Sequence, residues 1–254
     1  MNNTLKVRDL TIGQGTPGII VPIVDRTYKE IIGKAEAVQP MRIDMVEWRA
    51  DFFDEVFDTE RVIYTACGLR HVLNDIPILF TFRTKKEGGD KEIDIDAYTK
   101  LNIAVAQSGK VDLIDVECFQ GDDIAKKNID AIHKAGVFVV GSNHDFHATP
   151  PKDEMISRLK KMQELGADIP KIAVMPNDMN DVLALLSATY EMRQKYADRP
   201  IITMSMSAKG VISRLSGEMF GSSMTFGSIG QTSAPGQIPV QQLSEVLNIL
   251  HNVL

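Results

Sequence analysis

The stretch ADIPKIAVM, residues 167–175, holds the residue on which the interpretation of this sequence depends. Its apolar residues predict a short buried strand, and Lys171 lies in the middle of them. A lysine is almost never fully buried unless another group pairs with it or a reaction uses it. Lys171 therefore belongs either to an exposed edge strand or to the wall of a functional site, and the predicted fold has to decide between the two.

Eight short apolar runs, this strand included, recur along the chain. They are GIIVPIV (18–24), RIDMVEW (42–48), PILFTF (77–82), VDLIDVE (111–117), VFVVGS (137–142), IPKIAVM (169–175), PIITMSM (200–206) and SSMTFGS (222–228). Segments with apolar residues at three- and four-residue steps lie between them and predict helices. The clearest are residues 27–38, 95–109, 153–166 and 181–196. Gly136 and Gly166 follow two such segments as expected of helix C-terminal caps. This alternation predicts parallel strands joined by right-handed helical crossovers.

About eight strand–helix units in 254 residues predict an α/β fold, a (β/α)8 TIM barrel that forms one domain over residues 1–254. The opening MNNTLKVRDLTIGQG (1–15) alternates like a hairpin, which we expect to close the bottom of the barrel. A doubly wound open sheet is the alternative, but VPIVDRTYKE (21–30) lacks the glycine-rich fingerprint that such a sheet would carry. A closed barrel has no edge strand, so the barrel favours a functional Lys171.

Composition restricts the classes of partner. The net charge of −6 and the pI of about 5.4 argue against a nucleic-acid-binding protein, which usually carries a basic stripe. Cys67 and Cys118 form no CxxC pair and suggest a reducing compartment. The N-terminus has no apolar signal region, and no apolar run approaches the roughly 18 residues of a membrane span. We therefore expect a cytoplasmic protein with no membrane partner.

Polar residues gather where the predicted strands end, which is the end of a barrel that carries active sites. Each has a structural explanation as well: polar pairs that satisfy one another, a solvated loop pair, a helix-covering arginine or a mobile loop. The set comprises Glu47, Arg49, Arg83, Glu87, Asp115, Glu117, His144, Lys171 and the loop GSIGQTSAPGQ (227–237), with Arg214 in the segment VISRLSG. Together they predict a charged pocket at one end of the barrel.

The residue types suggest imine chemistry. Desolvation on the inner wall, together with nearby arginines, would favour a neutral Lys171, which could add to a ketone to give a Schiff base. His144 on the adjacent strand is the natural base for the proton next to the imine. Glu87 or Glu117 could orient the imidazole. The arginine side chains Arg49, Arg83 and Arg214 would hold an anionic substrate, since guanidinium groups bind carboxylates bidentately.

Six segments in order resemble the type I 3-dehydroquinate dehydratase family. They are EWRAD (47–51), FTFRTKKEGG (80–89), DVE (115–117), SNHDF (142–146), PKIAVM (170–175) and SAPGQ (233–237). The length is similar to that of the free-standing enzymes of this family rather than of fused chains. Cys118 departs from the aliphatic residue expected after DVE, but it alternates away from the face of Glu117 and changes little.

The resemblance implies a step of the shikimate pathway, the syn elimination of water from 3-dehydroquinate to give 3-dehydroshikimate. It implies Lys171 as the Schiff-base lysine, His144 as the acid and base, and Glu87 as the residue that orients His144. It further implies substrate binding by Glu47, Arg49, Arg83, Arg214, Ser233 and Gln237. It implies no metal and no organic cofactor, a homodimer, and a loop at Ser233 that closes over the substrate. The roles of Asp115 and Glu117 stay open between substrate contact and support of neighbouring groups.

Three other functions remain as alternatives at this point. A class I Schiff-base aldolase acting on an anionic keto sugar would use the same lysine but break a carbon–carbon bond. A metal-dependent enzyme would use His144 and His147 in HDFH, for which no third ligand can be placed. A barrel that only binds an anionic metabolite would need no nucleophile–base pair. Substrate profiling, chelation and a turnover assay separate these alternatives.

Overall fold

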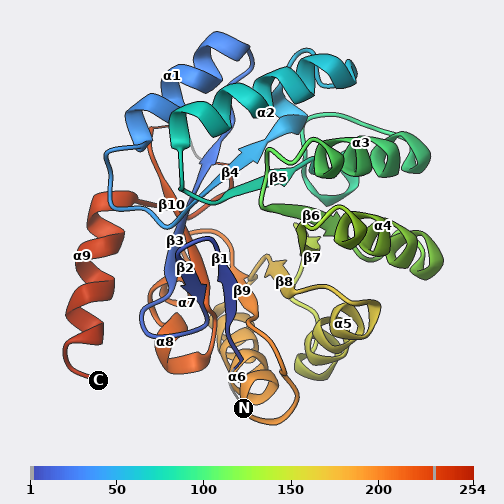
Figure 1. Cartoon of the computed structure of the whole chain (residues 1–254). Helices are drawn as coiled ribbons and strands as arrows, with labels where there is room; N and C mark the ends of the chain where they lie inside the picture. Colours follow the sequence, from blue (N-terminus) through green and yellow to red (C-terminus); the bar gives the residue numbers. More distant parts are fainter. Residues whose placement is uncertain (1–2, 231–232) are drawn as a thin grey trace.

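Strands and helices alternate along the chain from Gly18 onwards (Figure 1). The computed structural model describes residues 3–230 and 233–254. Its elements are β1 (Leu5–Val7), β2 (Leu10–Ile12), β3 (Gly18–Ile23), α1 (Tyr28–Val38), β4 (Met45–Arg49), the 3-10 turn η1 (Ala50–Phe52), α2 (Thr59–Leu73), β5 (Ile78–Thr81), the 3-10 turn η2 (Lys85–Glu87), α3 (Ile95–Gln107), β6 (Leu113–Glu117), α4 (Asp122–Lys134), β7 (Phe138–Asp145), α5 (Lys152–Leu165), β8 (Ile169–Val174), α6 (Met179–Lys195), β9 (Ile202–Ser205), α7 (Val211–Leu215), α8 (Gly217–Phe220), β10 (Met224–Ser228), β11 (Ile238–Pro239) and α9 (Val240–His251).

The parallel strands form a sheet that curls into a ring with the helices outside it (Figure 1). The strand order is β11-β10-β3-β4-β5-β6-β7-β8-β9. An isolated parallel bridge between Ile201 and Ser222 joins the β9 side to the β10 side, and the Ser223 amide donates to the Ile201 carbonyl at 2.8 Å. The predicted barrel is confirmed. Lys171 pairs with Ser142 of β7 on one side and with Ile202 of β9 on the other, so an edge-strand role is excluded.

An antiparallel hairpin of β1 and β2 covers the end of the barrel at which the strands begin (Figure 1). Its buried residues Val7 and Ile12 pack into the interior apolar cluster. Beside the hairpin that cluster contains residues near the starts of the strands: Ile20, Met45, Leu79, Leu113, Val140, Ile169, Ile202 and Met224. It extends along the barrel interior to Ala173, Met204, Met206 and Phe226 at the cavity. The hairpin expected to close the bottom of the barrel is therefore present, although Met1 and Asn2 of the predicted segment lie outside the described residues.

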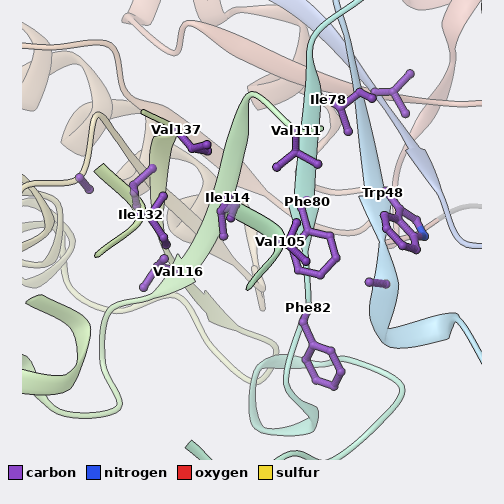
Figure 2. Close-up of a cluster of buried hydrophobic side chains, with 14 of the residues drawn as sticks. Trp48, Ile78, Phe80, Phe82, Val105, Val111, Ile114, Val116, Ile132 and Val137 are labelled. Carbon is purple, nitrogen blue, oxygen red and sulfur yellow. The ribbon is translucent and has the colours of Figure 1, made fainter. Parts of the chain in front are cut away.

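The outward-facing positions of the strands pack against the helices. Figure 2 shows part of this layer, with Trp48 from β4, Phe80 from β5, and Ile114 and Val116 from β6 among the labelled side chains. Successive residues of a strand point to opposite faces. The positions between these apolar residues therefore point into the barrel, and toward the carboxyl ends of the strands they carry polar groups. Because the outward-facing residues supply the apolar packing against the helices, the inward-facing positions can carry charged groups.

Capping residues fix where several helices begin and end. Thr27 and Glu30 form a reciprocal capping box at α1, and the Asp58 side chain accepts hydrogen bonds from backbone amides at the start of α2. The predicted cap residues Gly136 and Gly166 have φ of 80° and 101°, the left-handed conformation that glycine adopts without strain. Within the described ranges no helix is long and apolar enough to cross a membrane.

The strand β7 continues three residues beyond the predicted run VFVVGS (137–142). Its pairing with β8 extends through His144, opposite Ala173, and Asp145, opposite Val174. The strand is therefore longer than the apolar run predicted, because the parallel ladder to β8 keeps the backbone extended through polar residues. His144 consequently lies on a strand, two residues beyond Ser142, which is the residue that pairs with Lys171.

Candidate active site

A cavity of about 430 Å³ opens at the carboxyl ends of the barrel strands. Of the residues that the resemblance implies for catalysis and substrate binding, all except Arg214 line it: Glu47, Arg49, Arg83, Glu87, His144, Lys171, Ser233 and Gln237. Asp115 and Glu117, whose roles stayed open, do not line it. Alternation along the strands makes Glu47, Arg49, His144 and Lys171 face the same interior space, and the segments that follow the strands bring the other residues to it. The structure therefore brings together residues that lie as far apart as positions 47 and 237 in the chain.

The amine of Lys171 lies inside the barrel, where the residue is only 3% exposed. Its Nζ is 3.4 Å from Asp115 Oδ2, 3.8 Å from Glu47 Oε1 and 4.8 Å from the centre of the Phe226 ring. Arg83 binds the same Asp115 oxygen at 2.7 Å, so an arginine is near the lysine as expected. The amine therefore lies between two carboxylates and close to an arginine.

His144 forms a hydrogen-bonded pair with Glu87. Nδ1 of His144 is 2.9 Å from Glu87 Oε2, and the backbone amide of His144 donates to the same oxygen at 2.9 Å. A carboxylate at Nδ1 favours the tautomer with the proton there, which leaves Nε2 as the basic nitrogen. Between the two glutamates considered for this role, the structure favours Glu87, because Glu117 accepts instead from Thr84 and Arg83.

Burial governs the protonation of this pair. Burial, together with the charges of Arg83, Lys171 and Arg49, holds the pKa of His144 well below its ordinary value, so the imidazole is neutral near pH 7. Burial and then the charge of Glu117 raise the pKa of Glu87 to about 8. The pair thus combines a neutral base with a carboxyl group that takes up a proton near physiological pH.

Two of the three predicted anion-binding arginines already have carboxylate partners. Arg49 makes a bidentate pair with the buried Asp51, with both contacts at 2.8 Å. Arg83 pairs with Asp115 at 2.7 Å and with Glu117 at 3.0 Å. Burial alone would raise the pKa of Asp115, but the charges of Arg83 and Lys171 outweigh it and hold that pKa below the ordinary value. These ion pairs orient the arginines and offset much of their charge.

Arg214 is in a different position. It is buried, its guanidinium donates to the Pro235 carbonyl at 3.0 Å, and it lies 3.8 Å from Met204 Sδ, which lines the cavity. Within residues 3–230 and 233–254 no carboxylate pairs with it. Burial lowers the pKa of Arg214 to about 10, which still leaves it charged at pH 7. Arg214 therefore holds a positive charge next to the cavity that the described part of the chain does not neutralise.

The predicted loop approaches the cavity at Ser233 and Gln237. The Ser233 amide donates to Gln237 Oε1 at 3.0 Å, and Gln237 Nε2 donates to Ser233 Oγ at 2.9 Å. Gly236 has a φ of 80°, and a Cβ there would come within 2.3 Å of the Ser207 carbonyl oxygen. This close approach ties the loop to the end of β9. Gln231 and Thr232 of the predicted loop lie outside the described residues.

Sequence reasoning assigned no role to several residues of the site. Asp51 is fully buried, holds Arg49, and also accepts from the amides of Arg83 and Asp90. Phe226 and Met206 form an apolar side of the cavity. The period-two alternation of PIITMSM and SSMTFGS could have identified Met206 and Phe226 as inward-facing. Asp51 falls in a turn and had no such signal.

Two remaining sequence interpretations concern cysteine and metal. Cys118 packs in the outer apolar layer, as its alternation from Glu117 predicted, and burial raises the pKa of its thiol to about 12, so it is an unreactive side chain. His147 does not line the cavity. Across the described ranges, no three histidine, cysteine or carboxylate side chains are grouped as a metal site would require.

Comparison with known proteins places these residues in a family. The family model described as type I 3-dehydroquinase matches residues 19–253. The chain belongs to the type I 3-dehydroquinase family. The 3-dehydroquinate dehydratase of Clostridium botulinum is 53% identical over 251 residues, which are 99% of each chain. That of Bacillus subtilis is 54% identical over 249 residues, 98% of each chain.

A solved type I 3-dehydroquinase has the same fold. The crystal structure of type I 3-dehydroquinate dehydratase from Clostridium difficile with covalent modified comenic acid matches with a TM-score of 0.97 and 52% sequence identity, and the match covers 100% of both chains. The barrel and its bottom hairpin are therefore features shared with a member of the family over the full length of this chain.

Proposed function

We propose that this type I 3-dehydroquinase dehydrates 3-dehydroquinate to 3-dehydroshikimate through a Schiff base on Lys171. The observation that carries the proposal is the placement of a buried amine and a hydrogen-bonded His144–Glu87 pair on the wall of the same cavity. A lysine amine supplies the nucleophile, and a neutral imidazole supplies the base. A cavity that only binds a metabolite has no use for either group.

In the first part of the reaction the amine of Lys171 adds to the substrate ketone and water leaves, so that a carbon–nitrogen double bond replaces the carbonyl. Asp115 and Glu47, both within 4 Å of Nζ, stabilise the positive charge of the protonated imine. Arg214 is suited to bind the substrate carboxylate, because it is a buried cation beside the cavity. Ser233 and Gln237 offer hydroxyl and amide groups to the substrate hydroxyls.

In the second part His144 removes the C2 proton, which lies next to the imine, and the electron pair passes toward the iminium nitrogen. Glu87 stabilises the imidazolium that results, by the hydrogen bond to Nδ1. The same imidazolium then gives its proton to the departing hydroxyl, so water leaves from the face on which the proton was taken. Hydrolysis of the imine frees the product and restores the amine of Lys171.

Reductive trapping tests the proposal. The protein is incubated with 3-dehydroquinate and borohydride, and intact and peptide mass spectra are recorded. We expect a reduced adduct on the peptide that contains Lys171, and none with Lys171→Ala, which should also lose dehydration. Turnover near the parent level in Lys171→Ala would refute the imine. Analysis of the product separates loss of water from the carbon–carbon cleavage of an aldolase.

His144→Ala provides the second arm of this test. The variant keeps the nucleophile but lacks the base, so imine should form and then stall, and the trapped adduct should accumulate beyond the parent level. A variant that turns over normally would exclude His144 as the base. The homodimer implied by the resemblance is part of this proposal, and light scattering of the purified protein measures it.

A further inference from the structure

A chain of hydrogen bonds connects the helix layer to the His144–Glu87 pair. Asn143 lies on β7 beside His144, and its Nδ2 donates to Glu87 Oε1 at 3.2 Å. Arg158 of α5 donates from a terminal guanidinium nitrogen to Asn143 Oδ1 at 2.9 Å. Asn143 is buried, and neither it nor Arg158 lines the cavity. Both therefore act on the site only through Glu87.

The chemistry of the guanidinium group decides which way the Asn143 amide points. Arginine has donors and no acceptor, so Asn143 must present its oxygen to Arg158. The amide nitrogen then faces Glu87 as a donor. Arg158 is itself held in place, because it donates to Glu154 one turn earlier on α5 and lies 5.9 Å above the Phe119 ring.

We propose that Arg158 and Asn143 are positioning residues that orient Glu87 toward His144 and favour its ionised form. Donation to a carboxylate favours its ionised form, and the ionised form carries the negative charge that stabilises the imidazolium. The inference rests on the proposed function, since it concerns the base of that reaction. It adds two residues outside the cavity to the set that controls the rate.

The need for this support follows from what surrounds Glu87. Arg83, from the segment after β5, contacts Glu87 at 3.6 Å, and its charge stabilises the ionised form. Burial and the negative charges of Glu117 and Asp115 on β6 favour the protonated form. His144 on β7 shares the proton with it. The hydrogen bond that Asn143 donates also favours the ionised form of Glu87, as the charge of Arg83 does.

We call the hydrogen-bonded series Arg158–Asn143–Glu87 the relay. Four variants separate its effect from a general loss of packing or charge on α5. Asn143→Leu removes the donor and keeps the branching of the side chain, and Arg158→Leu leaves the amide free to rotate. Arg158→Lys keeps a donor-only group and should restore the amide orientation. Lys161→Leu is the matched control, because Lys161 lies on the same helix and over the same Phe119 ring at 5.2 Å but does not contact Asn143.

The first measurement is the pH dependence of kcat/KM for dehydration. We expect the acidic limb to move to higher pH by about one unit in Asn143→Leu, because a hydrogen bond to a charged group is lost. A smaller shift in the same direction is expected in Arg158→Leu. Arg158→Lys and Lys161→Leu should superimpose on the parent.

The second measurement is independent of turnover. The ring Cε1–H signal of His144, assigned with His144→Gln, is followed by NMR from pH 5 to 9 without substrate, and its midpoint should shift as the kinetic limb does. If the parent fails to dehydrate 3-dehydroquinate but these midpoints shift, the proposed function falls and the relay stands. Unchanged profiles in Asn143→Leu, or equal shifts in Lys161→Leu and Arg158→Leu, overturn the relay. Should Asn143→Leu not fold, the Arg158→Leu and Arg158→Lys pair on the helix decides.

Discussion

At the scale of single residues, the site depends on charges that are buried in pairs. Lys171 and Arg83 share one oxygen of Asp115, and Arg49 is held by Asp51. A buried charge is costly unless a partner compensates for it, and Lys171, Arg83 and Arg49 are each matched with a carboxylate. Glu87 differs, because burial and the neighbouring negative charges raise its pKa by more than the charge of Arg83 lowers it. Its titration should therefore affect the stability of the whole protein.

We predict that Glu87→Gln changes the pH dependence of stability. The folded-state pKa of Glu87, about 8, lies above that of the unfolded chain, so the native state holds a proton that the unfolded state has lost between these values. Relative to Glu87→Gln, the parent should lose on the order of 2 kcal/mol of unfolding free energy as the pH rises from 5 to 9. Urea unfolding at both pH values measures this change.

Glu87→Gln should lose clearly less over the same range, because glutamine does not titrate. Glu92→Gln, an exposed glutamate in the same connection, is the control and should follow the parent. A Glu87→Gln variant whose stability follows the same pH profile as that of the parent would contradict the prediction.

At the scale of elements, the 3-10 turn η2 is what brings Glu87 to β7. The turn ends at Gly88, which has a φ of 85° and lies against the Phe146 ring. A Cβ at Gly88 would be 2.3 Å from Phe146 Cε2. Glycine is thus required at this position both for the backbone conformation and for the close contact with the segment that follows His144.

We predict that Gly88→Ala lowers kcat at least tenfold, because relief of the contact has to move η2 and with it Glu87. Gly109→Ala is the matched control, since Gly109 has a φ of 64° but no atom within 4 Å of its added Cβ. The control should cost about 1 kcal/mol of stability from backbone strain and leave kcat unchanged. Steady-state kinetics and thermal melts check both, and equal kcat values for the two variants would exclude the proposed role of the contact.

At the scale of the whole molecule, stability and chemistry occupy opposite ends of one barrel. The interior is apolar where the strands begin, beneath the β1–β2 hairpin, and charged where they end. A packed apolar bottom supplies stability that the charged top does not, which separates the two functions in space.

We predict that Ile12→Ala lowers the unfolding free energy by about 2–4 kcal/mol, because Ile12 is fully buried in the interior cluster. KM and kcat at a temperature well below the melting point should stay within about twofold of the parent, since the variant alters the end opposite the cavity. Thr11→Ala, an exposed neighbour, serves as the control and should change neither property. A large rise in KM for Ile12→Ala would mean that the bottom of the barrel also shapes the site.

The pattern of residues along the chain was enough to predict the barrel, its bottom hairpin and the residues that face the cavity. Alternation of apolar runs with helical periods restricts the connections to right-handed crossovers, and period-two alternation assigns each strand residue to one face. Lys171, His144 and Glu47 were predictable for this reason. The family resemblance added Ser233 and Gln237, for which the local pattern predicts only a loop.

Tertiary structure alone decided which charges pair. Asp51 with Arg49, Arg83 with Asp115 and Glu117, and Arg214 with no carboxylate in the described residues are choices that depend on distances of a few ångströms across the barrel. The sequence determined that cations and carboxylates share one end of the barrel. It did not determine their partners, because Coulomb energies and hydrogen bonds depend on separation and direction in space, which residue spacing along a chain does not encode.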